Sequence, residues 1–210
     1  VKSLVSTPLA DAVAANYGVE MRNVLTGYGE RILERCPGEG CPELRQALAR
    51  YLARNRGLHI TVDQIIIGSG AEYLYGLIIE LLGRDRIYGI ESPSYKKIEE
   101  VYRASDVSYD PLRLSVDGID SADLSATDAS VLHTTPYRSY PTGVSASANR
   151  RHEYIRWASA GERYIIEDDF DSEFTVSTKH EDTVFSLDYP GNPVYNTSKN
   201  LYNHKGGFPP

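Results

Sequence analysis

The sequence contains little cysteine and no long apolar run. Cys36 and Cys41 are its two cysteines, too few for a disulfide framework and wrongly spaced for a zinc knuckle. No apolar stretch approaches the roughly 18 residues that a membrane-spanning helix needs. Residues 1–4 lack the apolar core and the cleavage site of a secretory signal peptide. We therefore expect two free thiols in a cytoplasmic protein that does not enter a membrane.

Positive charge is also scarce. The chain has 22 Lys and Arg against 29 Asp and Glu, which gives a formal net charge of -7. A nucleic-acid-binding surface needs a basic field, so we expect no nucleic acid to be contacted by this chain itself. With 41% hydrophobic and 24% charged residues, the composition is typical of an ordered globular domain rather than of a disordered chain.

Short β-branched runs alternate with helical patterns along the chain. This alternation predicts an α/β fold with a mainly parallel sheet flanked by helices. Residues 71–82 are apolar nearly all round, which indicates a helix packed in the interior. The predicted strands are Gln64–Ile67, Arg86–Ile90, Val107–Asp110, Ser130–Thr134, Tyr164–Glu167 and Pro193–Thr197, and the predicted helices are Pro42–Asn55, Ala71–Leu82, Tyr95–Ala104 and Ala148–Ala160.

The residues that follow the predicted strands are the candidates for chemistry, because ligands of parallel sheets bind at the carboxyl ends of the strands. Residues 68–72, Gly-Ser-Gly-Ala-Glu, open a helix, and they form either a phosphate-binding turn or an ordinary one. Tyr95 follows the next strand and alone indicates only the start of a helix. The loop 135–143 contains two prolines and a glycine, so it is rigid and forms either a crossover or a pocket wall.

Residues 167–173 hold five carboxylates in seven positions. They form a solvated acidic loop, a divalent-cation site, or a site whose first carboxylates lie at a buried strand end and need a cationic partner. Lys199 lies 31 residues after Asp168, the length of one strand–crossover–strand unit. A lysine in a crevice opposite a carboxylate, near a phosphate-binding helix start, is typical of a Schiff-base lysine.

In their order and spacing, these segments resemble the fold-type I pyridoxal-phosphate (PLP) enzymes of the aspartate aminotransferase superfamily. Within it the sequence is most similar to the aminotransferase-like domain of MocR-type regulators of the GntR family. Tyr140 stands where the enzymes usually carry Asn before Pro-Thr-Gly, and an aromatic follows the acidic pair where the enzymes tend to have Pro-Tyr. The matching segments are 27–29, 42–45, 51–52, 56–57, 63–70, 91–95, 135–136, 140–143, 150–151, 157–158, 164–174 and 198–199.

The resemblance implies a three-layer αβα PLP-dependent transferase large domain, with PLP as the cofactor. It implies that Lys199 forms the aldimine, that Asp168 pairs with the protonated pyridine nitrogen, and that Tyr95 stacks on the ring. The cofactor phosphate would be held by N–H groups near Gly70, Ala71 and Glu72, with help from Ser198.

Two departures from the family pattern weaken the implied site. Phe170 stands where these proteins usually have Tyr, so a hydroxyl that bonds the cofactor's phenolic oxygen is lost. Lys205 is the nearby replacement for an Arg on the phosphate, and lysine lacks the bidentate fork of arginine. We therefore expect electronics poorly tuned for transamination and weaker phosphate capture.

The resemblance also implies how the chain is organised. We expect an N-terminal arm over 1–26 and the large domain over 27–210, without a winged helix before it or a small domain after it, so that the end reads as a truncation. A homodimer and an amino acid or other small amine are the implied partners. Three hypotheses stay open: an effector-sensing regulator domain, a free-standing aminotransferase, and a truncated domain that no longer binds cofactor.

Overall fold

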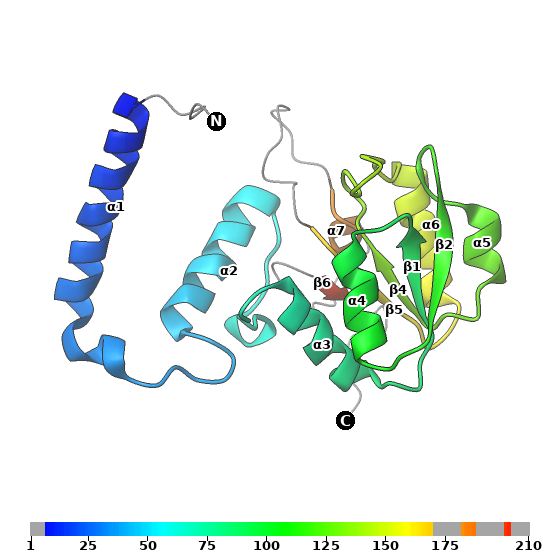
Figure 1. The fold of residues 1–210 in the computed structure, drawn as a ribbon, viewed down its shortest axis with the longest axis horizontal. Coiled ribbons are helices and arrows are strands. Elements are labelled where there is room, and N and C mark those ends of the chain that lie inside the picture. The colour runs from blue at the N-terminus through cyan, green and yellow to red at the C-terminus, as the bar shows by residue number, and fades with distance from the viewer. Residues whose placement is uncertain (1–6, 170–181, 188–199, 203–210) are drawn as a thin grey trace. The chain divides into compact units, whose positions relative to one another are not determined.

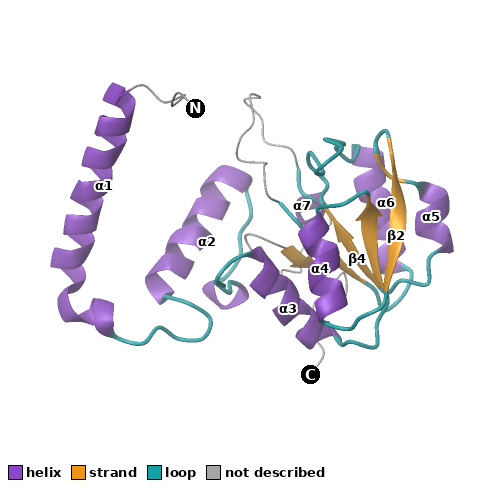
Figure 2. Ribbon diagram, in the orientation of Figure 1, coloured by secondary structure: helices purple, strands orange, loops and turns teal. Residues whose placement is uncertain are grey.

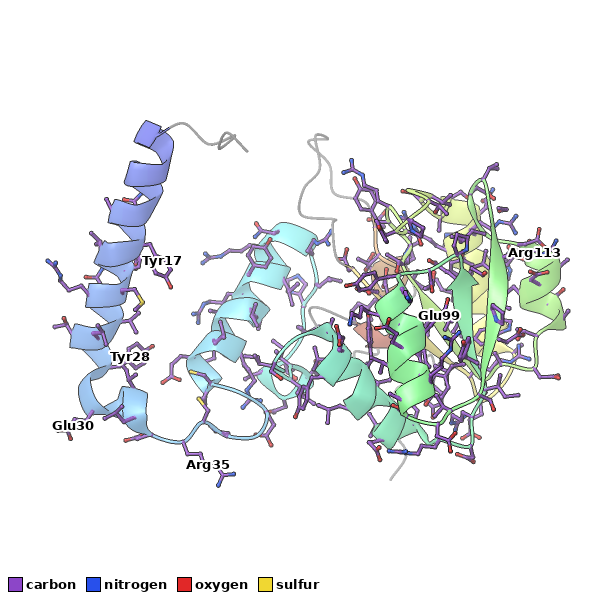
Figure 3. The ribbon with its side chains drawn as sticks, viewed as in Figure 1. Tyr17, Tyr28, Glu30, Arg35, Glu99 and Arg113 are labelled. Atoms are coloured by element: carbon purple, nitrogen blue, oxygen red, sulfur yellow. The ribbon has the colours of Figure 1, made fainter. Side chains whose placement is uncertain are left out.

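The computed structural model describes residues 7–169, 182–187 and 200–202, and the chain divides into two compact units, 1–38 and 39–210. The first unit contains helix α1 (Thr7–Tyr28) and the 3₁₀ turn η1 (Gly29–Leu33). Tyr17 and Tyr28, labelled on α1 in Figure 3, are exposed. Helix α1 was not among the predicted elements, although it includes most of the predicted arm.

The second unit is built on a sheet whose strand order is β3-β2-β1-β4-β5-β6. The central strands β2, β1, β4 and β5 are parallel, whereas β3 pairs antiparallel with β2 and β6 antiparallel with β5. The prediction of a mainly parallel sheet is therefore confirmed (Figure 1). The strands are β1 (Tyr88–Ser92), β2 (Tyr109–Ser115), β3 (Gly118–Ile119), β4 (Val131–Thr134), β5 (Tyr164–Glu167) and β6 (Asn200–Tyr202).

Helices cover both faces of this sheet, as Figure 2 shows for α4 and α6. Alternate residues of β4 point to opposite faces, so Val131 packs with α3 and α4 while Leu132 packs with α5, α6 and α7. The result is three layers with a hydrophobic core on each side of the sheet. The helical elements are α2 (Pro42–Arg56), η2 (Val62–Gln64), α3 (Ala71–Leu82), α4 (Lys96–Ala104), α5 (Ser121–Ala126), α6 (Ala148–Ser159) and α7 (Val184–Leu187).

Three of the strand predictions need comment. The prediction of a strand over Gln64–Ile67 is wrong: a capping box between Thr61 and Gln64 closes a 3₁₀ turn, and the residues after it do not join the sheet. The strand expected over Val107–Asp110 begins later, at Tyr109, because the Val107 N–H bonds back to the carbonyl of Tyr102 at the end of α4. The predicted strand Pro193–Thr197 lies outside the described residues.

Helix α3 has the predicted bounds but not the predicted surroundings. Its inner face is buried, while Tyr73, Leu77 and Leu81 on the outer face are exposed by 51%, 39% and 47%. The expectation that its apolar residues are all packed in an interior is therefore wrong for this face. The helix lies against the sheet on one side only.

Candidate functional site

A cavity of about 640 Å³ lies within the second unit, where β1, β4 and β5 end. Its walls come from the start of α3 and from the segments that follow these three strands. Parallel sheets place their ligand sites at this edge. The lining residues are Ser69, Gly70, Ala71, Glu72, Tyr75, Tyr95, Thr135, Tyr137, Arg138, Tyr140 and Asp168.

The first turn of α3 forms one wall of the cavity. Gly70 is its N-cap residue with φ 113°, a backbone conformation that favours glycine. The amide N–H groups of a first helical turn have no partners within their own helix, and the helix dipole adds partial positive charge there. This wall is therefore suited to an anionic group such as a phosphate.

The Asp168 carboxyl contributes to the same cavity from the end of β5. Its backbone N–H donates to the carbonyl of Thr134 at 2.9 Å, and the Tyr75 hydroxyl donates to its Oδ2 at 2.6 Å. The residue is only 7% exposed. Burial, with smaller contributions from the carboxyls of Asp169 and Glu91, raises the pKa of Asp168 to about 8. A cationic group placed beside it would favour the ionised form.

The neighbouring Asp169 has a different environment. It forms a partly buried ion pair with Arg56, the last residue of α2. The first two residues after β5 are thus one carboxyl on the cavity and one paired to an arginine, and neither is simply solvated. The rest of the acidic segment, from Phe170 to Glu173, lies outside the described residues.

Uncharged aromatic groups stand behind Tyr75. The ring of His133, in β4, meets the ring of Tyr75 edge-on at 4.8 Å, and its Nδ1 lies 2.9 Å from the hydroxyl of Tyr102. Burial lowers the pKa of His133 to about 3 and raises that of Tyr102 well above its ordinary value. Both side chains are therefore neutral near pH 7, and a hydrogen bond joins the Tyr102 hydroxyl to the imidazole Nδ1.

The loop 135–143 is held in place by Glu91, at the end of β1. The carboxyl of Glu91 accepts hydrogen bonds from the Thr134 hydroxyl, the Thr135 N–H and the Ser139 hydroxyl. Burial raises the pKa of Glu91 while these three donors oppose the shift. The loop expected to be rigid is thus anchored at two points and lines the cavity with Tyr137, Arg138 and Tyr140.

Aromatic side chains surround the outer part of the cavity. Tyr95 precedes α4 as its N-cap residue and is 47% exposed. Its ring meets that of Tyr140 edge-on, with centroids 6.1 Å apart. The Arg138 guanidinium lies over the Tyr137 ring, 4.9 Å from its centroid. These groups could contact the face of a planar ligand or an anionic group on it.

The structure brings together five of the residues singled out from the sequence: Gly70, Ala71, Glu72, Tyr95 and Asp168 all line this cavity. Their roles toward a cofactor stay predictions. Phe170, Ser198, Lys199 and Lys205 lie outside the described residues. Asn200, which follows Lys199 in the sequence, pairs with Glu167 next to Asp168.

Sequence reasoning missed the residues that support Asp168 and the loop. Tyr75 and His133 each interrupt an apolar run with a polar group, and this is the signal that could have identified them. Glu91 was named only within the matching segment 91–95, although a carboxylate near the end of a buried strand needs hydrogen-bond donors.

Other features of the described residues bear on alternative sites. Within the ranges 7–169, 182–187 and 200–202, no group of three or more His, Cys, Asp or Glu is placed to hold a metal ion. Cys36 and Cys41 are free thiols. None of the described helices is long and apolar enough to cross a membrane.

Solved structures with the same arrangement define the class of fold. An archaeal alanine:glyoxylate aminotransferase superimposes with a TM-score of 0.74 at 23% identity, covering 84% of this chain and 46% of that one. The second unit therefore has the architecture of a fold-type I aminotransferase large domain, as expected. At this level of identity the similarity concerns the fold alone.

The family is defined by the sequence match over residues 9–170, which fit the family described as aminotransferase class I and II. The chain belongs to this family, whose cofactor is pyridoxal phosphate.

Several curated proteins that are similar to this chain are transcriptional regulators. YdeL of Bacillus subtilis, an uncharacterized HTH-type transcriptional regulator, is 28% identical over 83% of this chain and 38% of its own length. The HTH-type pyridoxine biosynthesis transcriptional regulator PdxR of Corynebacterium glutamicum is 32% identical over 65% and 30%. The probable rhizopine catabolism regulatory protein MocR of Rhizobium meliloti is 26% identical over 74% and 32%. The predicted resemblance to MocR-type regulators is confirmed, and the chain spans about a third of these relatives.

Proposed function

We propose that this chain is the PLP-binding, effector-sensing domain of a MocR-type transcriptional regulator. One observation carries the proposal: the first turn of α3 and the buried Asp168 carboxyl line one cavity. Together they match a ligand with a phosphate at one end and a protonated ring nitrogen at the other. The family membership and the regulators among the relatives support the same reading.

In this proposal each residue has a limited task. Bound PLP supplies an electron-withdrawing ring that can exchange amines. N–H groups near Gly70, Ala71 and Glu72 bind its phosphate together with Ser198 and Lys205. Asp168 keeps the proton on the pyridine nitrogen, and Tyr95 covers the ring face.

Lys199 holds the cofactor covalently through its amino group. The pairing of Asn200 with Glu167 supports this assignment, because it brings the neighbour of Lys199 in the sequence next to the neighbour of Asp168. Phe170 offers no hydroxyl to the phenolic oxygen. We therefore infer that the domain recognises an amino acid or other small amine, which would take the place of Lys199 on the cofactor, and that it responds without efficient turnover.

The same proposal includes the setting of the domain. We place the protein in the cytoplasm, where regulators act, and we propose that it forms a homodimer. The exposed apolar side chains of the outer face of α3 favour association, since large apolar patches on a protein surface rarely stay uncovered. Light scattering of the purified chain tests this part, and a monomer at micromolar concentration would contradict it.

The deciding experiment is a PLP titration followed by borohydride reduction and peptide mapping. We expect a visible absorption band on binding and a reduced cofactor fixed to Lys199. Lys199→Ala should abolish the fixed cofactor, while Lys96→Ala, at an exposed position on α4, should not change it. Absence of any band for the unmodified chain would favour a domain that binds no cofactor.

Added amines separate the sensor from the enzyme. A sensor changes its spectrum with an amino compound and releases little keto acid, whereas steady production of keto acid would identify an aminotransferase. In that case Lys199 also moves the proton between carbon atoms as a general base.

A further inference from the structure

The Tyr75 hydroxyl lies at a position that the cofactor roles above do not use. Tyr75 is on the second turn of α3 and is 1% exposed, yet it lines the cavity. Its hydroxyl donates to Asp168 Oδ2 at 2.6 Å. This contact joins α3 to the residue after β5, 93 positions away in the sequence.

The ring of Tyr75 is fixed from behind. His133 contacts it edge-on at 4.8 Å and is itself hydrogen-bonded to Tyr102 at 2.9 Å. All three side chains are at most 2% exposed. Because the interior is closely packed, the Tyr75 ring cannot turn away without displacing its neighbours. The direction of its hydroxyl is therefore set by the fold and does not depend on a ligand.

The charges around Asp168 favour its neutral form. Glu91 and Asp169 both add negative charge, although the Arg56 guanidinium offsets that of Asp169. Tyr102 and His133, on α4 and β4, are uncharged near pH 7. A hydroxyl donated to a carboxylate stabilises the ionised form, so Tyr75 opposes the combined effect of burial and of these carboxyls.

We propose that Tyr75, held by His133, is the positioning residue of Asp168. Its hydroxyl fixes the carboxyl at the cavity and strengthens its ionised form, which a protonated ring nitrogen requires. The role of Tyr75 toward a ring nitrogen rests on the proposed function. The coupling between Tyr75 and Asp168 does not, and it can be measured without PLP.

The test compares two matched substitutions in the full 210-residue chain. Tyr75→Phe removes the hydroxyl and keeps the ring. Tyr88→Phe is the control, since the buried Tyr88 hydroxyl donates to the carbonyl of Gly83 and does not contact Asp168. Carboxyl ¹³C NMR without PLP, with Asp168→Asn to assign the signal, follows the Asp168 pKa in each variant.

We expect Tyr75→Phe to raise the pKa of Asp168 by about one unit, which is a tenfold change in proton affinity, and Tyr88→Phe to leave it unchanged. PLP should bind Tyr75→Phe about tenfold more weakly near pH 7. An Asp168 pKa that is the same in Tyr75→Phe and the unmodified chain would overturn the positioning role.

This design distinguishes failure of the proposed function from failure of the inference about Tyr75. If the unmodified chain binds no PLP, the proposed function fails, while the pKa comparison still decides the role of Tyr75. If Tyr75→Phe does not fold, the ¹³Cζ signal of Tyr75 in the unmodified chain replaces it. That signal should shift with the same midpoint pH as Asp168, and a signal that ignores the carboxyl titration would reject the coupling.

Discussion

Asp168, which lines the cavity, and His133, which packs behind Tyr75, are both buried, and both keep their neutral forms over a wide pH range. Asp168 holds its proton up to a pKa of about 8, whereas His133 does not gain one until about pH 3. In each case burial is the largest cause, because it penalises the charged form. The two residues therefore change the free energy of unfolding of the domain in opposite senses as pH rises.

Asp168→Asn should reduce the loss of stability that the domain, measured without PLP, shows as pH rises. The unfolded chain loses this proton near pH 4 and the folded chain near pH 8, so the contribution of Asp168 to the free energy of unfolding falls as pH rises through that window. The slope is at most about 1.4 kcal/mol per pH unit. Urea unfolding at pH 7 and pH 8, above the range in which His133 contributes, should show a smaller loss for the variant. An equal loss in both proteins would contradict the raised pKa.

His133→Gln should remove the contribution of opposite sense. The unfolded imidazole gains a proton near pH 6.5, while the folded one stays neutral down to about pH 3. The contribution of His133 to the free energy of unfolding therefore falls as pH decreases between these values. Urea unfolding at pH 7 and pH 5 should show that acidification favours the folded state more in the variant than in the unmodified chain, because the His133 contribution opposes that of Asp168 between these pH values. His152→Gln, at an exposed position on α6, is the matched control for the substitution itself.

At the level of whole elements, the loop 135–143 depends on a single carboxylate. Glu91→Ala leaves the donors of Thr134, Thr135 and Ser139 without this acceptor. We expect a loss of about 2–4 kcal/mol in the free energy of unfolding. We also expect faster hydrogen exchange at the Thr135 N–H. Glu153→Ala, which removes a partly exposed partner of Arg150, should cost less than about 1 kcal/mol.

Some elements could be predicted from the sequence because local pattern and tertiary environment agree. Strand β5 and helix α3 have the predicted bounds, since a buried parallel strand is a short apolar run and a glycine marks the helix start. The strand prediction over Gln64–Ile67 is wrong because Ile65 is fully buried without belonging to the sheet. An apolar run alone does not reveal whether its backbone pairs with another strand.

Strand β3 and helix α5 were missed because they are short. Strand β3 has two residues and α5 six, which are too short for a periodic signal. Helix α5 is held by a capping Asp120 and by the ion pair of Asp123 with Arg113, labelled in Figure 3. Helix α1 carried a readable signal, since Tyr17, Met21, Val24 and Tyr28 follow a helical spacing.

The candidate site was predicted in part for a similar reason. Asp168, Tyr95 and the turn at Gly70 follow strands or begin helices, where ligands of parallel sheets bind. Tyr75 lies within a helix, and its contact with Asp168 depends on how α3 packs against β5. Sequence spacing does not contain that distance.

At the scale of the whole molecule, the candidate cavity and both hydrophobic cores lie within residues 39–210. We expect a chain without residues 1–38 to fold and to keep the near-ultraviolet circular dichroism of Trp157. It should unfold cooperatively in urea, because its cores remain complete. A gradual, non-cooperative transition would show that the first unit is needed for folding.

The position of Asp168 also determines when the cavity can form during synthesis. Strand β5 leaves the ribosome after β1 and β4, and its pairing with β4 brings Asp168 to the cavity. A ligand that needs this carboxyl cannot assist the earlier steps of folding. It binds the finished domain, so it should slow unfolding and leave the folding rate unchanged. Cofactor supply would then control how long the domain survives in the cell, and not how fast it matures.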